Sequence, residues 1–118
     1  MLKRALPSAT KAQKSRWDTM REIGCVVARL RGLGFVPGEI HHLTVCGRTI
    51  SHDDTICLNP WSHRGVVFDG WTRMRCEQVF GPSLARGSKP FHAHFGSDDE
   101  LLAEQERLLL RYGFKEAA

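Results

Sequence analysis

Two short stretches of the sequence, Glu39-Ile-His-His-Leu43 and Thr55-Ile-Cys-Leu-Asn-Pro-Trp-Ser-His63, decide the predicted fold. Residues 39–43 and 55–58 favour short strands, and the polar residues between them predict a loop or a hairpin connection. Pro60 suits the first turn of a helix, where its missing N–H is no loss. The order strand, loop, strand, short helix predicts a ββα arrangement within a small α+β protein. It would place the histidine pair of the first stretch beside His63.

Helices are predicted on both sides of this arrangement. Ser8 or Thr10 could cap a helix that runs to about Leu30, because apolar residues recur along it at three- and four-residue steps. Residues 74–79 predict a short helix. Ser97 and Glu100 have the spacing of a capping box, which begins a last helix ending before Gly113. We therefore expect residues 1–8 to form a flexible basic leader and residues 9–118 a single domain.

Length and composition limit the classes of protein that fit. The chain has 118 residues, of which 42% are hydrophobic, enough for one domain with a modest core. It contains no apolar run of eighteen residues and no apolar stretch after the basic first residues, so we expect no membrane segment, no signal peptide and a cytoplasmic protein. The four cysteines show no paired spacing: Cys25, Cys46, Cys57 and Cys76. Reduced thiols are favoured, with a zinc site or disulfides as alternatives.

The charge is basic and unevenly distributed. The net charge is +4, and the first 31 residues hold eight basic residues against two acidic ones, whereas the end of the chain is acidic. A basic N-terminal region suits a polyanion such as nucleic acid. A solvated helix face on an ordinary basic protein explains the charge equally well.

The histidines are the strongest candidates for chemistry. His41 and His42 are adjacent on a predicted strand, so their side chains should point to opposite faces. One could bind a divalent ion while the other takes a proton from water, and His63 could be a second metal ligand. Asp54 could bind the metal, orient the base or belong to a turn. Asn59 lies four residues before His63 and is a further candidate contact.

Several segments together carry a resemblance to a known family. They are Gly24-Cys25, Glu39-Ile-His-His-Leu43, Gly47-Arg-Thr49, Thr55-Ile-Cys-Leu58, Pro60-Trp-Ser-His-Arg-Gly65, Gly81-Pro-Ser-Leu-Ala85 and Phe95-Gly96. In this order and spacing, the span from Gly24 to about Leu109 resembles the HNH (ββα-metal) endonucleases. It looks most like the Ref-type, RecA-dependent recombination-enhancement nucleases of phages. The implied fold is a small ββα-metal core flanked by helices.

The resemblance implies a role for each matching residue. His41 would bind the metal, His42 would be the general base, and His63 would close the metal site. Asp54 stands where the family usually has an asparagine that steadies the base, and His52 is a candidate metal or phosphate contact. The implied cofactor is Mg²⁺ or Mn²⁺, with Zn²⁺ as another occupant of the site. The implied partners are DNA and a RecA filament.

The resemblance also shows a departure. Related proteins often hold a structural zinc between a C-x-x-C pair and two ligands on the helix. Here only Cys25 remains, because the other three positions are Ala28, Asn59 and Ser62. One ligand cannot hold zinc, so no structural zinc is expected.

Other residues receive more general interpretations. His92 and His94, two residues apart on a predicted strand, would share one face; a structural or surface role is favoured over metal binding. Trp61 and Trp71 are interpreted as core residues. Basic residues in the loops around the proposed site favour phosphate contacts, with solvated side chains as the alternative: Arg48, Arg64, Arg86 and Lys89.

The leading hypothesis is a metal-dependent DNA endonuclease of HNH type, encoded by a phage or prophage. The main alternative is a non-catalytic DNA-binding or recombination-accessory module on a nuclease scaffold, and a third is a zinc-binding structural protein. The sequence alone predicts no oligomeric state and no DNA sequence preference.

Overall fold

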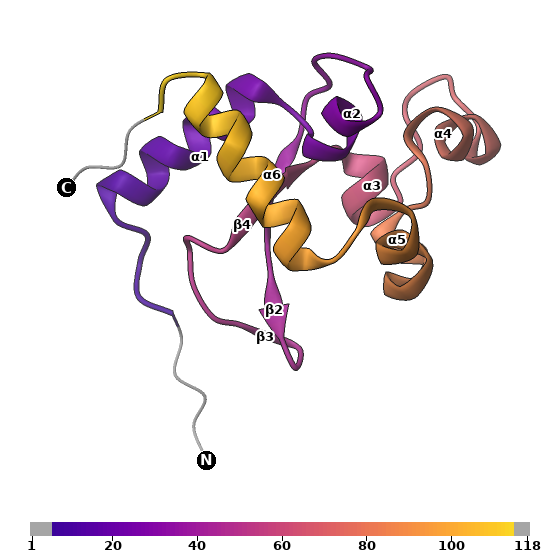
Figure 1. Ribbon diagram of the computed structural model, residues 1–118. Coiled ribbons are helices and arrows are strands. Elements are labelled where there is room, and N and C mark those ends of the chain that lie inside the picture. The colour runs from indigo at the N-terminus through magenta and orange to yellow at the C-terminus, as the bar shows by residue number, and fades with distance from the viewer. Residues whose placement is uncertain (1–5, 115–118) are drawn as a thin grey trace.

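The computed structural model describes residues 6–114, in which six α-helices and two small antiparallel sheets form an α+β fold (Figure 1). The elements in chain order are α1 (Lys11–Ile23), α2 (Val26–Leu30), β1 (Glu39–His42), β2 (Thr44–Val45), β3 (Arg48–Thr49), β4 (Thr55–Leu58), α3 (Pro60–Arg64), α4 (Arg73–Phe80), the 3-10 helix η1 (Leu84–Arg86), α5 (Ser88–Phe95) and α6 (Asp98–Arg111). No helix among these residues is both long and apolar enough to cross a membrane.

The predicted strand, loop, strand and helix are all present. Strands β1 and β4 pair antiparallel, with His41 opposite Ile56 and His42 opposite Thr55. All four residues of β4 are buried, because α1, α2 and α6 pack around this strand. Helix α3 starts directly after β4, with Pro60 in its first turn as expected, and it contacts β1. The start of β1 and the start of α3 are therefore neighbours.

The connection between β1 and β4 is a hairpin. Thr44 pairs with Thr49 and Val45 pairs with Arg48, and the two turn residues, Cys46 and Gly47, both have positive φ. This geometry is that of a tight two-residue hairpin turn. The hairpin extends away from the helices (Figure 1).

The first predicted helix is in fact two helices, which corrects the expectation of one helix to about Leu30. Thr10 caps α1 in a capping box with Gln13, and α1 ends at Gly24. Gly24 has φ +87, and a Cβ atom there would lie 2.6 Å from the carbonyl oxygen of Val36. The next residue donates its N–H to the same oxygen over 2.8 Å. The close approach of this distant segment ends the helix and requires glycine.

Residues 91–95 form a helix and not the predicted strand. Phe91 and Phe95 lie one helical turn apart, and both pack in the main core with their ring centroids 5.1 Å apart. The apolar spacing of four residues suits a helix, and Pro90 lies in its first turn. His92 and His94 consequently do not share a strand face.

The main apolar core lies between α1, α2, β4, α5 and α6. Its largest buried side chains include Met20, Ile23, Ile56, Leu58, Phe91, Leu101 and Leu109. A second cluster contains the buried Trp61 and Phe80, and the half-buried Trp71 stacks on Phe80 with the ring centroids 5.4 Å apart. Both tryptophans thus pack in this cluster, as predicted. The cysteines are free thiols, buried except for Cys46.

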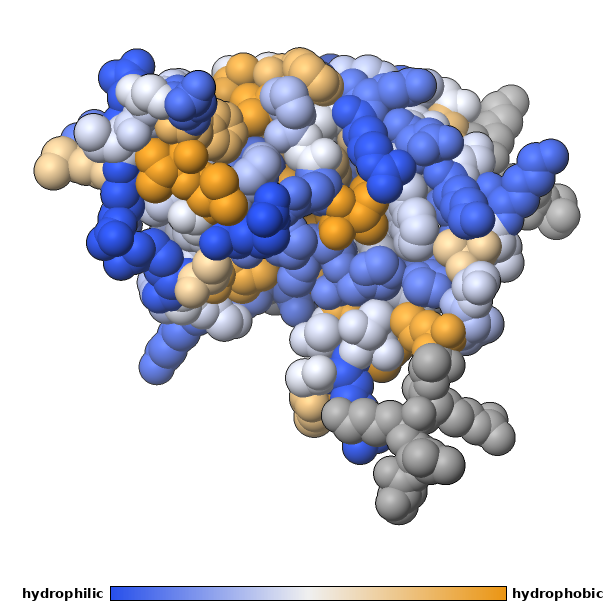
Figure 2. Space-filling view, turned by 180° about the vertical axis from the view of Figure 1, so that it is seen from behind, coloured by the Kyte–Doolittle hydropathy of each residue, from blue (hydrophilic) through white to orange (hydrophobic). Residues whose placement is uncertain are grey.

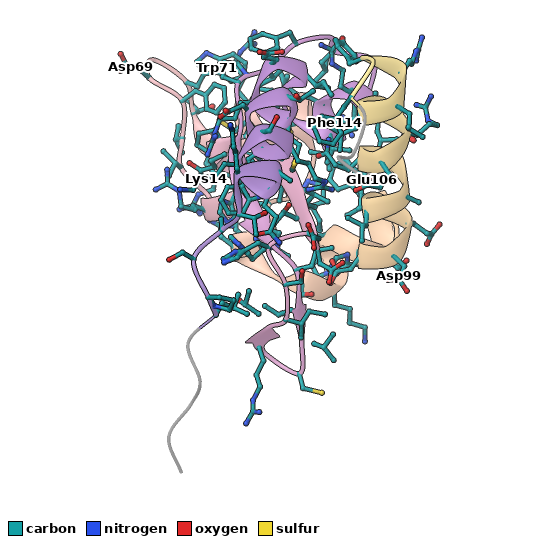
Figure 3. The ribbon with its side chains drawn as sticks, turned by 90° about the vertical axis from the view of Figure 1, so that its left-hand side faces the viewer. Lys14, Asp69, Trp71, Asp99, Glu106 and Phe114 are labelled. Carbon is teal, nitrogen blue, oxygen red and sulfur yellow. The ribbon has the colours of Figure 1, made fainter. Side chains whose placement is uncertain are left out.

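A buried arginine joins three elements of the fold. Arg16 of α1 is 2% exposed and donates to the Thr55 hydroxyl over 2.6 Å and to the Thr55 carbonyl over 3.3 Å. It also forms an ion pair with Glu106 of α6. Figure 3 shows α1 and α6 side by side, with Glu106 on the α6 side that faces α1. The guanidinium therefore ties both helices to β4.

We expect Glu106→Gln to lower the free energy of unfolding by about 2 kcal/mol, because it weakens a charge-assisted hydrogen bond to a buried cation. Urea unfolding followed by circular dichroism measures this loss. Glu104→Gln is the matched control, since Glu104 lies on the same helix and pairs with the exposed Arg107. Such a surface pair contributes less than about 1 kcal/mol. Equal losses in the two variants would contradict the role assigned to Arg16.

Candidate functional site

His41 and His63 meet where β1 contacts α3. Their ring centroids are 4.8 Å apart at an interplanar angle of 62°. Burial lowers the pKa of His41 to about 4, with the charge of His63 as the next cause. The His41 ring is therefore neutral near pH 7 and keeps one nitrogen lone pair. The imidazole rings of His41 and His63, which come from separate segments, thus lie close together as the sequence predicts.

A carboxylate holds the His63 ring in a fixed orientation. Glu39 Oε1 lies 2.8 Å from His63 Nδ1, so Nδ1 carries the proton and donates it to the carboxylate. Arg64 binds the same carboxylate with Nε and Nη2, at 2.5 and 3.0 Å, and its hydrogen bond is the main cause that lowers the pKa of Glu39. Within residues 6–114, His63 Nε2 makes no hydrogen bond. This carboxylate–histidine pairing is usual behind metal-binding imidazoles.

His42 has different neighbours from His41, as expected for adjacent residues on a strand. Its Nε2 lies 3.0 Å from His52 Nδ1, and His52 Nε2 lies 2.7 Å from the carbonyl oxygen of Pro7. The Trp17 ring packs edge-on against both histidines, at centroid distances of 5.6 and 5.4 Å. Burial, followed by the charge of His52, lowers the pKa of His42. Both ring nitrogens of His52 are engaged, so in this arrangement the ring offers neither a lone pair to a metal nor an N–H to a phosphate.

Two other candidates lie apart from the histidine rings. Asp54 is half-buried, and its backbone carbonyl accepts from the N–H of Leu43 over 2.8 Å. Within residues 6–114 its carboxylate makes no hydrogen bond to His42. Asn59 is fully buried and caps α3 through Ser62, so it is not available as a metal or phosphate contact.

The positions compared with zinc ligands form a hydrogen-bonded cluster. The Asn59 amide donates to Cys25 Sγ over 3.3 Å and to Ser62 Oγ over 3.0 Å. Burial raises the pKa of the Cys25 thiol, so this side chain is a neutral thiol. The cluster joins the start of α2 to the start of α3 through neutral groups.

Sequence reasoning did not identify Glu39 or Asp98 as neighbours of the candidate metal pair, and it favoured a structural or surface role for His92 over metal binding. His92 Nδ1 donates to the Gly96 carbonyl over 2.9 Å, and its Nε2 lies 3.3 Å from Asp98 Oδ1. Both groups are near enough to act on His41, because the Asp98 charge raises the pKa of His41 and the His92 charge lowers it. The acidic start of α6 was the one available signal, and it is also ordinary helix capping.

The donor set suits a divalent ion held by few protein ligands. Among residues 6–114, no group of three or more His, Cys, Asp and Glu side chains is arranged to hold a metal ion. His41 and His63 offer two imidazoles, which suit Zn²⁺ better than Mg²⁺ or Mn²⁺. Such a pair would leave the remaining coordination positions to water or phosphate.

Of the four basic candidates, three are exposed and placed on segments around the histidines: Arg48 on the hairpin, Arg86 in η1 and Lys89 in α5. The fourth, Arg64, is also exposed and binds the Glu39 carboxylate through Nε and Nη2. A phosphate contact from Arg64 stays a prediction. Figure 2 shows apolar patches separated by hydrophilic side chains on one face, with no continuous apolar surface there.

Comparison with known families shows which family the chain belongs to. The chain is a small α+β domain with a histidine cluster where β1 contacts α3. The family described as "Recombination enhancement, RecA-dependent nuclease" matches residues 9–110, and the chain belongs to this family. The predicted resemblance is confirmed at that level, and membership indicates a nuclease with a part in recombination. No curated protein and no solved structure matches the chain.

Proposed function

We propose that the protein is a metal-dependent DNA endonuclease of the HNH type, in which His41 and His63 bind the ion and His42 is the general base. The single observation that carries the proposal is the meeting of the His41 and His63 rings at 4.8 Å. The Glu39 contact strengthens it, because it directs the His63 Nε2 lone pair away from the carboxylate. Family membership supplies the nuclease activity that this site would perform.

The proposed reaction is hydrolysis of one phosphodiester bond. A divalent ion on His41 and His63, which is Mg²⁺ or Mn²⁺ with Zn²⁺ as another occupant, would stabilise the charge on the leaving 3′ oxygen. The neutral His42 ring takes a proton from water, and the water oxygen attacks phosphorus. The products are a 5′-phosphate and a 3′-hydroxyl. Asp54 supports the base through its backbone bond to Leu43, the residue after His42.

DNA binding in this proposal is electrostatic. Arg48, Arg86 and Lys89 lie on three different segments and are exposed, so they can follow a phosphate backbone without reading bases. The family description adds dependence on RecA, which we extend to a RecA filament on the DNA. A phage or prophage origin and action in the cytoplasm fit this role.

The deciding experiment uses plasmid DNA paired by RecA with a single strand. We expect nicking in Mn²⁺ or Mg²⁺ and none in EDTA or without RecA. A non-catalytic recombination-accessory module is the second candidate, favoured by the finding that no three-ligand group is preformed in residues 6–114. Binding to DNA without cleavage in any divalent ion would support that module and refute the enzyme.

Glu39→Ala should weaken Mn²⁺ binding by about 10- to 100-fold, because it frees the His63 ring from its orienting carboxylate. Calorimetric titration with Mn²⁺ measures the change. Glu39→Gln is the matched variant, since its amide oxygen can still accept from His63 Nδ1, and it should keep most of the affinity. Equal weakening in the two variants would instead assign the effect to lost charge.

A further inference from the structure

A continuous set of hydrogen bonds runs from the backbone of Pro7 through His52 to His42. The Pro7 oxygen is 2.7 Å from His52 Nε2, and His52 Nδ1 is 3.0 Å from His42 Nε2. A carbonyl oxygen can only accept, so His52 Nε2 must carry a proton. In the neutral form of His52, which has one N–H, Nδ1 is then an acceptor.

The acceptor nitrogen of His52 determines the tautomer of His42. Because His52 Nδ1 accepts, His42 Nε2 must donate, and the lone pair of His42 is left on Nδ1. We propose that His52 is a positioning residue that selects the Nε2–H tautomer of His42 and so presents His42 Nδ1 as the proton acceptor. The inference about catalysis rests on the proposed function, whereas the tautomer itself does not.

The surrounding contacts hold His52 in place for this role. Trp17 Nε1 donates to the His52 carbonyl over 3.2 Å and to the Thr55 hydroxyl over 3.1 Å. Thr55 lies opposite His42 in the β1–β4 register. One tryptophan therefore fixes the backbone of His52 relative to the strand partner of His42 and packs against both imidazoles. Two independent contacts, one to backbone and one to ring, set the geometry.

The chemical step balances without proton transfer to His52. An O–H bond of water breaks, and its proton joins His42 Nδ1. The oxygen forms a bond to phosphorus as the bond from phosphorus to the 3′ oxygen breaks. The 3′ oxygen leaves with the electron pair of that bond and takes a proton from solvent, which gives the 3′-hydroxyl. His42 then carries two N–H groups, and its Nε2–H still donates to His52 Nδ1. Orienting the base was one of the roles left open for Asp54, and we infer it for His52 from the hydrogen bond to His42.

The test reads the tautomer directly in the full-length protein. Long-range ¹H–¹⁵N NMR spectra, recorded near neutral pH without metal, distinguish a protonated from an unprotonated ring nitrogen. In the wild type we expect His42 to be protonated at Nε2 and not at Nδ1. A wild-type ring protonated at Nδ1 would overturn the proposal, whether or not any variant folds.

Variants connect the tautomer with the rate. His52→Leu removes the acceptor, so the His42 tautomers should mix and kcat should fall on the order of tenfold or more, with KM for DNA unchanged. His52→Asn places an amide oxygen near the position of the lost Nδ1. It should restore most of the Nε2–H tautomer of His42 and most of kcat. His94→Asn is the matched control, because His94 is exposed and bonds Arg31 instead. An unchanged tautomer in His52→Leu would refute the proposal.

The outcomes separate this inference from the proposed function. If the wild type cleaves no DNA but His42 shows the Nε2–H form that His52→Leu abolishes, the positioning contact is correct and the enzyme proposal is wrong. If the wild type cleaves DNA while His42 is protonated at Nδ1, the nuclease stands and the role of His52 is wrong.

Discussion

His42→Ala is expected to lower the rate of DNA cleavage by about 10²- to 10⁴-fold, the usual contribution of a general base. Burial and the neighbouring His52 lower the pKa of His42, so the ring is neutral near pH 7 and can accept a proton. DNA binding should persist, because the exposed basic side chains are unchanged. The measurement is the nicking rate in Mn²⁺, together with DNA affinity measured in EDTA.

His94→Ala is the control for this change, since it removes an exposed histidine that bonds Arg31 outside the histidine cluster. It should cleave at the wild-type rate. If His42→Ala also keeps that rate, the proton acceptor is another group and the proposed mechanism is wrong. If His42→Ala loses both DNA binding and DNA cleavage, His42 instead has a structural role.

His63→Ala is expected to weaken Mn²⁺ binding by at least about a hundredfold and to abolish cleavage at ordinary ion concentrations, because it removes one of the two imidazole ligands. Removing a direct ligand should cost more than removing Glu39, which acts through the ring. Titration with Mn²⁺ followed by electron paramagnetic resonance measures the binding. Added Mn²⁺ should partly restore cleavage in this variant but not in His42→Ala.

The fold should survive the loss of His63. Its side chain is half-buried, and Glu39 keeps its two bonds to Arg64 when the imidazole is absent. Circular dichroism should therefore match that of the wild type. A folded His63→Ala protein with unchanged Mn²⁺ affinity would place the ion elsewhere and remove the basis of the metal site.

Much of the fold could be predicted because its signals are local. The strand at residues 55–58, the helix start at Pro60 and the capping box of Ser97 and Glu100 each depend on a few neighbouring residues. The ββα order of the segments then places His41 beside His63. The break at Gly24 could not be predicted in the same way. It depends on the approach of Val36, which is distant in sequence. Residues 91–95 were misread because alternating histidines concealed the four-residue spacing of two phenylalanines.

The site was predicted less completely than the fold. The sequence indicates which histidines could act, but it does not show which side chains hold them. Glu39, Trp17 and His52 are recognised as supports only from ring and hydrogen-bond distances. Asn59 was a candidate contact from its place in the sequence, whereas in the structure it is fully buried and caps a helix.

The pairing of β1 with β4 makes the histidine pair sensitive to insertions. Side chains alternate between faces along a strand, so a slip of one residue would turn His41 to the face that bears Trp17 and His42 to the face that bears His63. Lengthening the β2–β3 hairpin leaves this alternation intact. The chain should therefore tolerate added residues at the hairpin turn far better than a single added residue within β1.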